Sequence, residues 1–232
     1  MAERPVFTPA PEERPFVRAV CFQLEWNGGF AASQKKKNVD ALHQAAAREG
    51  LAPLLEISTK SEEKLGRHLS AFHLKVRVGE IALSLESVFQ GSKVFEGGGP
   101  FTDLYMVDAR TAKRDERLRS SGNVVGFELA GVSFPSEPKT MFYDWLYISA
   151  LFEHREWLMD RLPKYAGFTD IEFNPSRSVN CQARSCALLV ALAKSNLLET
   201  AMSSPLRFAE VVSPSEREAS KARESPLRAG RS

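Results

Sequence analysis

The spacing of apolar residues along the chain alternates between strand-like and helix-like patterns. Phe16–Trp26 alternates apolar with other residues and is rich in β-formers, so it predicts a strand. Val124–Phe134 alternates in the same way and predicts another strand. The stretch "HLKVRVGEIALSL" predicts a pair of strands about Gly79, or one strand that leads into the helix carrying Glu86.

Helical spacing fills much of the remainder. Ser33 is a suitable cap for a helix over Gln34–Glu49, and a second helix is expected near Glu62–His68. Apolar residues three and four apart predict a long helix over Thr140–Leu162. A last helix, from a cap at Asn180 to about Leu198, carries the apolar run "CALLVALA" and should be central to the core.

These elements indicate one α+β domain that is richer in helix and has a few antiparallel strands. We expect residues 1–15, rich in Pro, Glu and Arg, to be an extended lead-in before a domain over residues 16–202. A long loop is expected over residues 96–123, with Gly97–Gly99 as a flexible connection. Residues 203–232 are rich in Ser, Pro, Arg and Glu, a composition typical of a disordered tail.

Composition restricts the class of protein. The 232 residues are 43% hydrophobic and 26% charged, as in ordinary globular proteins. No apolar run approaches the length of a membrane span, and the N-terminus lacks a signal-peptide core, so we expect a cytoplasmic protein that has no membrane partner. Three cysteines are an odd number, which fits reduced thiols better than a disulfide framework.

The net charge of +2 comes from the expected tail. Residues 203–232 hold six Lys or Arg and four Glu, so the remaining 25 basic and 25 acidic residues cancel. A protein that grips duplex phosphates without sequence preference usually has a basic excess. The body of this chain has none.

Metal and phosphate-loop motifs are absent from the sequence. The four histidines are scattered, and Cys181 and Cys186 lack a CxxC pair, so we expect no metal or cofactor. Gly97–Gly99 are not followed by the GK[ST] start of a phosphate-binding helix.

Three polar residues interrupt the apolar run near residue 90. On a helix, Glu86, Gln90 and Lys93 would share one face, with Phe89 beside them. Such groups are costly to bury without partners. The spacing alone is compatible with a solvated helix face or with a functional site.

These residues also carry a family resemblance. "SLESVFQGSKVF" resembles the signature of the YbiA-like NADAR superfamily, with one extra residue, Val94, before the final Phe. "FAASQKKKN", "LEISTKS", "FYDWLYISAL" and "FTDIEFNPSRSVNCQARS" resemble the branch of NADAR antitoxins paired with DarT-type DNA ADP-ribosyltransferase toxins. The resemblance extends over about Phe16–Leu198. It implies a YbiA-like fold and an N-glycosidase that releases ADP-ribose from ADP-ribosylated guanine bases in single-stranded DNA.

The resemblance also assigns catalytic residues. The family's catalytic Glu, Asp and Trp correspond to Glu86, Asp170 and Trp145. Cleavage of a ribose C1–N bond builds positive charge at C1, which a nearby carboxylate stabilises, while a second acid eases departure of the purine.

A lysine is expected to form an imine with the opened sugar, as the antitoxin branch implies. Lys35 is the first choice because it follows the Ser-Gln pair that the branch shares, and Lys93 is a further candidate. Lys37 is expected to bind the diphosphate instead of acting as the nucleophile. Lysines in the first helical turn are disfavoured by the helix dipole by about 0.3–1 kcal/mol each, which favours the neutral amine.

The remaining substrate contacts are expected from residues in the matching motifs. Phe173 or Tyr143 could stack on a base, and Lys93 is also expected to contact substrate. The expected hydrogen-bonding and ionic contacts are Ser33, Gln34, Ser58, Lys60, Gln90, Gly91, Asn174, Asn180 and Arg184.

Two other functions remain open at this point. Other superfamily members cleave phosphoribosylamino-pyrimidine intermediates of riboflavin synthesis, although the "SQKKK" motif argues against that substrate. The chain could also neutralise a toxin without catalysis, by binding nucleic acid or the toxin itself.

Overall fold

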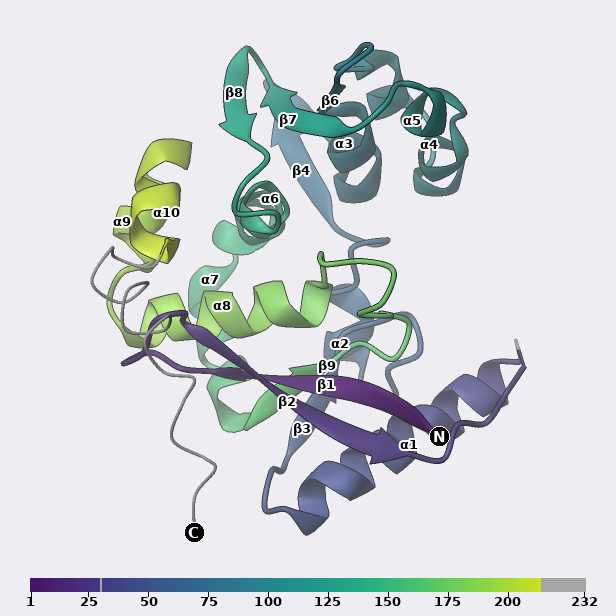
Figure 1. Ribbon diagram of the computed structural model, residues 1–232. Helices are drawn as coiled ribbons and strands as arrows, with labels where there is room; N and C mark the ends of the chain where they lie inside the picture. The colour runs from purple at the N-terminus through teal and green to yellow at the C-terminus, as the bar shows by residue number, and fades with distance from the viewer. Residues whose placement is uncertain (30, 214–232) are drawn as a thin grey trace, which may run out of the picture.

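The computed structural model describes residues 1–29 and 31–213 and is built around a four-stranded sheet (Figure 1). The strand order is β2-β1-β9-β3. The bounds are β1 Ala2–Pro9, β2 Val17–Leu24, β3 Leu54–Glu56 and β9 Gly167–Thr169. β1 pairs antiparallel with β2 along its whole length, whereas β3 and β9 are parallel.

The sheet is covered on both faces because successive residues of a strand point in opposite directions. Val6 contributes to a cluster with Leu42 of α1 (Ala32–Arg48), and the next residue, Phe7, belongs to the main core. The other face packs against α8 (Gln182–Lys194), whose apolar run is buried as expected (Figure 1).

A second layer lies beyond α8. Helix α6, Met141–Phe152, packs against α8, and the smaller sheets lie on its far side (Figure 1). The smaller sheets have the orders β4-β5 and β6-β7-β8. Their bounds, with those of the neighbouring helices, are α2 Lys64–His68, β4 Lys75–Val78, β5 Ile81–Ser84, α3 Leu85–Gly91, β6 Lys93–Phe95, β7 Val124–Leu129 and β8 Val132–Pro135.

The expected α+β class is confirmed, but several elements are divided where one was predicted. The strand over Val124–Phe134 is a hairpin, β7 and β8, because Ala130 and Gly131 both have positive φ, as its two-residue turn requires. The Thr140–Leu162 helix is α6 followed by α7 (Arg155–Met159) and a 3₁₀ turn, η2 (Leu162–Lys164).

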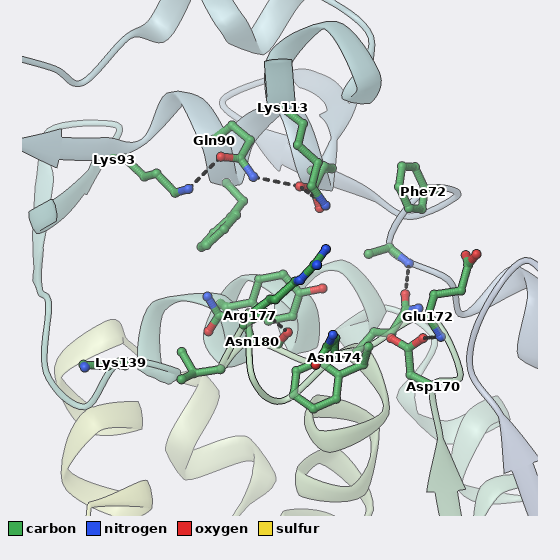
Figure 2. Close-up of a pocket in the computed structure, with 18 of the residues that line it drawn as sticks. Phe72, Gln90, Lys93, Lys113, Lys139, Asp170, Glu172, Asn174, Arg177 and Asn180 are labelled. Carbon is green, nitrogen blue, oxygen red and sulfur yellow. Dashed lines mark hydrogen bonds and ion pairs between the residues drawn. The ribbon is translucent and has the colours of Figure 1, made fainter. Parts of the chain in front are cut away.

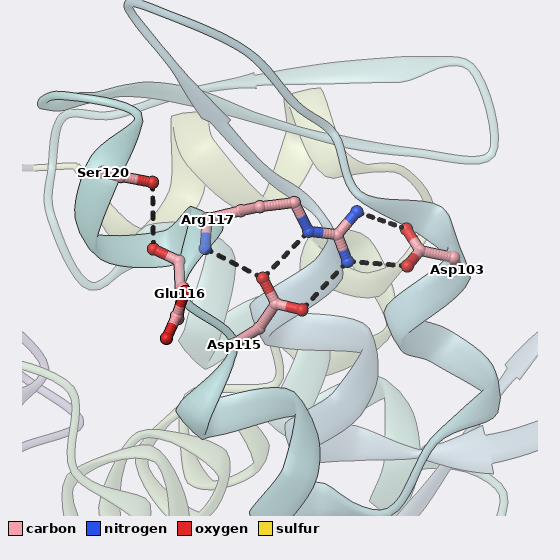
Figure 3. A network of polar contacts seen from close by, with 5 residues as sticks. All are labelled: Asp103, Asp115, Glu116, Arg117 and Ser120. Carbon is pink, nitrogen blue, oxygen red and sulfur yellow. Dashed lines mark hydrogen bonds and ion pairs between the residues drawn. The ribbon is translucent and has the colours of Figure 1, made fainter.

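Segment 96–123, expected as a long loop, contains short helices. They are η1 Thr102–Met106, α4 Ala109–Arg114 and α5 Arg117–Ser120. Figure 3 shows the network that fixes them: the Arg117 guanidinium donates to Asp103 at 2.6 and 3.2 Å and to Asp115 at 2.9 and 3.0 Å. The same guanidinium lies 4.6 Å from the ring centre of Phe101. This clamp joins the start of η1 to the turn after α4.

The ends of the chain also differ from expectation. Residues 1–15, expected ahead of the domain, supply β1, which lies between β2 and β9 in the main sheet. Beyond residue 202, Pro205–Val212 form α10, following α9 (Leu198–Met202), and Phe208 is fully buried. The expectation of disorder from residue 214 onward lies outside the described residues. In the described part, no helix is long and apolar enough to cross a membrane.

Candidate active site

A cavity of about 1040 Å³ opens between α3 and the loop that follows β9. Figure 2 shows Gln90, Lys93 and Lys113 on one side, across the cavity from Asp170 and Asn174. The volume is at the upper end of the range for ligand pockets, so a dinucleotide-sized ligand fits.

The first wall is helix α3, which is buried along its entire length. Gln90 Nε2 donates to Glu86 Oε1 at 2.8 Å, and Lys93 Nζ donates to Gln90 Oε1 at 2.7 Å. The three polar groups therefore satisfy one another along α3 and just beyond its end, which removes most of the cost of burying them. They do not share a helix face as predicted, because α3 ends at Gly91 and Lys93 begins β6.

Lys93 is held in an environment that favours the neutral amine. Burial lowers the pKa of Lys93 to about 8, with help from the charge of Lys113 and against the pull of Glu86. Its Nζ lies 5.0 Å from the ring centre of Phe89. About a tenth of this amine is unprotonated at pH 7.

Lys113 approaches the same carboxylate from the segment that Arg117 clamps. Its Nζ lies 3.9 Å from Glu86 Oε1, and its side chain is mostly exposed. Glu86 is only 7% exposed, so its carboxylate interacts with the cavity and with Lys93 and Lys113 rather than with bulk solvent. This end of the cavity combines one carboxylate with two amines.

The opposite wall carries Asp170, in the turn after β9. Its Oδ1 accepts from the Glu172 amide at 3.0 Å, and the residue is 9% exposed. Burial, followed by the nearby charge of Glu56, raises the pKa of Asp170 to about 8. The cavity thus holds a carboxyl group that is protonated at neutral pH.

Aromatic rings form the apolar part of the lining. Phe89 and Tyr143 meet edge to face with ring centres 5.1 Å apart, and Phe127 and Phe173 also line the cavity. Asn180 lines it as well, and its Oδ1 is buried without a hydrogen-bond partner. That atom is available for a donor on a bound ligand.

The lining contains a second group of cations, which lie against the ring of Trp26. The Arg4 guanidinium lies 4.4 Å and Lys35 Nζ 5.8 Å from the Trp26 ring centre. Over the whole lining there are six Lys or Arg side chains and four Asp or Glu side chains, of which Asp170 is protonated at neutral pH. This excess favours an anionic ligand.

Comparison with known protein families identifies the family of the chain. A family model described as the DarT1-associated NADAR antitoxin matches residues 2–222. The chain belongs to this family. No curated protein matches the chain. Membership in the NADAR-DarT1 family supports a role as the antitoxin of a DarT toxin.

Nine of the seventeen site residues expected from the sequence line the cavity of this NADAR antitoxin. They are Lys35, Glu86, Gln90, Lys93, Tyr143, Asp170, Phe173, Asn174 and Asn180. The NADAR signature thus places its Glu, Gln and Lys at one end, and the later motif supplies the residues across from them.

Other expected contacts have structural partners instead. Ser58 Oγ donates to Glu56 at 2.6 Å and accepts from the backbone amide of Lys60 at 3.1 Å, and neither Ser58 nor Lys60 is among the residues that line the cavity. Arg184 pairs with Asp144 between α8 and α6. A side chain at Gly91 would meet the Tyr105 ring at 2.7 Å, so this glycine allows close packing behind α3.

The first turn of α1 places only one of its expected residues in the cavity. Ser33 lies inside α1, whose N-cap is Ala31, and it is exposed. Gln34 and the exposed Lys37 are not among the lining residues, although Lys35 is. Neighbouring positions on a helix point about 100° apart, which separates Lys35 from Gln34.

Trp145, the family's expected catalytic tryptophan, is likewise not part of the lining. Tyr143 faces the cavity from the same helix, and a residue two positions later points away from it. Trp145 packs against Phe134 and Phe142, with ring centres 5.0 and 6.5 Å away. In this position it packs against the main core, and within the described residues its indole nitrogen is buried without a hydrogen-bond partner.

We expect the Trp145→Phe variant to keep turnover within about threefold of wild type, because Phe fills most of the same core space. Steady-state kinetics of ADP-ribose release would measure this. Trp157→Phe, on the exposed surface of α7, is the matched control. A loss of about a hundredfold for Trp145→Phe alone would show that the indole acts in the chemistry.

Sequence reasoning missed several lining residues, including Arg4, Trp26, Lys113 and Arg177. Arg4 lies in a segment that was expected to precede the domain, and Lys113 in a segment expected to be a loop. The signal for Trp26 was the strand alternation over Phe16–Trp26, whereas the composition around Arg4 gave no sign of a strand.

Proposed function

We propose that this protein is an N-glycosidase that removes ADP-ribose from ADP-ribosylated guanine bases in single-stranded DNA, and so reverses a DarT-type toxin. The observation that carries the proposal is the presence of Glu86, Lys93 and Asp170 in the lining of one cavity. Membership in the NADAR-DarT1 family supports the pairing with the toxin.

Glu86 is proposed to stabilise the reacting sugar. As the C1–N bond lengthens, positive charge develops on C1 and the ring oxygen. A carboxylate that is 7% exposed, in a cavity lined by Phe89 and Tyr143, interacts strongly with that charge because little water screens it. Gln90 holds the carboxylate in place through its 2.8 Å hydrogen bond.

Lys93 is proposed as the nucleophile, in place of Lys35. Its amine is partly neutral near pH 7, since burial lowers its pKa to about 8, and it belongs to the same hydrogen-bonded chain as Glu86. Lys35 lies near Trp26 and Arg4, where a cation suits the phosphates of ADP-ribose.

Asp170 is proposed as the acid that frees the base. The Lys93 nitrogen lone pair forms a bond to C1, and the C1–N bond electrons leave with guanine, which takes the proton of the Asp170 carboxyl. A proton then moves from the lysine nitrogen to the ring oxygen as the bond from C1 to that oxygen breaks, which opens the ring and gives an imine. Water then adds to the imine carbon, releasing ADP-ribose and the free amine.

The proposed activity is tested by incubating the full chain with a single-stranded oligonucleotide that carries ADP-ribosyl guanine. We expect free ADP-ribose and unmodified DNA as products, at a rate that EDTA leaves unchanged because the carboxyl and amine groups supply the chemistry. A phosphoribosylamino-pyrimidine is the comparison substrate. If the protein cleaved that compound and not the ADP-ribosylated oligonucleotide, the proposed substrate would be wrong.

We expect the rate of this reaction to follow a bell-shaped curve with its maximum close to pH 8. On the acid side the rate rises with pH because Lys93, whose pKa is about 8, must lose a proton. On the alkaline side it falls because Asp170, whose pKa is also about 8, must hold one. Initial rates in buffers of constant ionic strength measure the curve, and a rate independent of pH over about 6 to 10 would contradict both assignments.

A further inference from the structure

A second buried carboxyl group lies behind Asp170, outside the cavity lining. Glu56 ends strand β3 and is 2% exposed. Its carboxyl oxygens accept from Ser58 Oγ at 2.6 Å, Thr169 Oγ1 at 2.7 Å and the Ile171 amide at 2.9 Å. Burying a carboxyl group costs free energy of folding, so we expect its position to serve a function.

Two of these hydrogen bonds come from the residues on either side of Asp170, the proposed acid. Thr169 and Ile171 are the residues immediately before and after Asp170, and Glu56 binds both. β3 and β9 are parallel neighbours, and Glu56 pairs with Thr169 in their register. The carboxyl group therefore fixes the short segment from which Asp170 projects toward the cavity.

The network continues to the helix that carries Lys35. His43 Nε2 lies 2.8 Å from Thr169 Oγ1, and burial lowers the pKa of His43. The imidazole is therefore mostly neutral at pH 7 and supplies no positive charge beside Glu56. Burial raises the pKa of Glu56 itself, and the three hydrogen bonds that its carboxyl group accepts act in the opposite direction. The charge of Glu56 in turn acts on Asp170, whose pKa it raises.

We propose that Glu56 is a positioning residue: it holds the Thr169–Ile171 segment so that Asp170 faces the cavity, and its negative charge keeps the Asp170 carboxyl protonated. This inference rests on the proposed function, since the proton on Asp170 is the one given to the departing base. After that transfer, a proton from solvent water restores the carboxyl group.

Other groups around Asp170 exert smaller influences on it. Glu172, on the same segment, acts in the same direction as Glu56, and a hydrogen bond from Gln182 of α8 opposes both. Burial is the largest cause of the raised pKa of Asp170, and Glu56 comes second. Tyr143 of α6 and Cys181 before α8 also face Asp170, and burial raises the pKa of each, so both are uncharged at neutral pH.

The test is the pH profile of the Glu56→Gln variant. Glutamine keeps an oxygen acceptor for the Ile171 amide but carries no charge, so Asp170 should lose its proton at lower pH. We expect the alkaline limb of kcat/KM to move down by about one pH unit. Ser58→Ala is the control, since it removes one donor and leaves the Glu56 carboxyl in place, and its alkaline limb should remain within about half that shift.

A measurement without turnover separates this inference from the proposed function. Carbon-13 NMR of the Asp170 carboxyl should show a midpoint that falls in Glu56→Gln. In the wild type, the chemical shift of the Asp170 carboxyl should change in two steps as the pH rises, because two carboxyl groups that interact lose their protons in two separate steps and each step affects both groups. The wild-type spectrum keeps the test available if the variant does not fold.

The outcomes are distinct. A wild-type protein that releases no ADP-ribose contradicts the proposed function. An active wild type with a single-step Asp170 titration, or a Glu56→Gln variant that is slower by the same factor at every pH, overturns the role of Glu56 alone.

Discussion

The Lys93→Arg variant should lose on the order of 10³-fold or more in kcat, the loss typical of removing a nucleophile. Arginine can still donate to Gln90 Oε1 and keeps the positive charge, but its guanidinium stays protonated and cannot form an imine. Single-turnover release of ADP-ribose from a modified oligonucleotide measures the effect. Binding of free ADP-ribose should change by less than about tenfold, since the charge remains.

Lys35→Arg is the matched control for this prediction. Both lysines line the cavity, but Lys35 lies beside Trp26 and is assigned to phosphate binding, where arginine serves equally well. We expect its kcat within about tenfold of wild type. The reverse pattern, with Lys35→Arg inactive and Lys93→Arg active, would return the nucleophile to the residue first chosen from the sequence.

The second large effect is expected for Glu86→Gln, with a fall in kcat of about 10²–10³-fold. The amide keeps an oxygen that can accept from Gln90, so the fold of α3 should be preserved, but the charge that stabilises C1 is lost. Because Glu86 raises the pKa of Lys93, its removal should also move the acid limb of the pH profile to lower pH. Urea unfolding tests whether the fold is preserved, and the pH dependence of kcat tests the shift of the acid limb.

The same variant separates catalysis from neutralisation by binding. An antitoxin that acts by occlusion needs no turnover, so Glu86→Gln would still protect cells that express the toxin. On the enzymatic account, protection falls together with turnover. Lys194→Gln is the control, because Lys194 is an exposed cation at the end of α8 and is not among the residues that line the cavity. It should retain protection.

Local patterns in the sequence were enough to predict that the polar residues of α3 lie next to one another. Glu86 and Gln90 are four residues apart, and that spacing brings them into contact on any helix. The helix end at Gly91 could not be seen, because the helix stops where Gly91 and Ser92 pack against Tyr105, far along the chain. Lys93 still reaches Gln90, from a strand rather than from the helix.

Composition was misleading at the N-terminus. Pro5 and Pro9 suggested a segment without regular structure, yet both lie in β1. Proline is tolerated there because β1 meets β9 only at the Phe7–Phe168 pair, so few backbone donors are needed on that side. Only the paired structure reveals this, and it brings Arg4 to the cavity.

Motif membership did not separate ligand contacts from structural contacts. Ser58 and Arg184 lie in the matching motifs but bind Glu56 and Asp144, both of them buried acidic residues. A buried carboxylate needs donors as much as a ligand does, and the sequence cannot tell the two uses apart. The choice depends on which way each side chain points after the helices have packed.

The central claim is that Lys93 attacks the sugar carbon in the cavity it shares with Glu86 and Asp170. Borohydride reduction during turnover of an ADP-ribosylated oligonucleotide, followed by mass spectrometry of the digested protein, tests it directly. We expect ADP-ribose attached through a reduced C–N bond to the peptide that contains Lys93, and none in Lys93→Arg. An adduct on Lys35, or turnover that leaves no adduct at all, would contradict the claim.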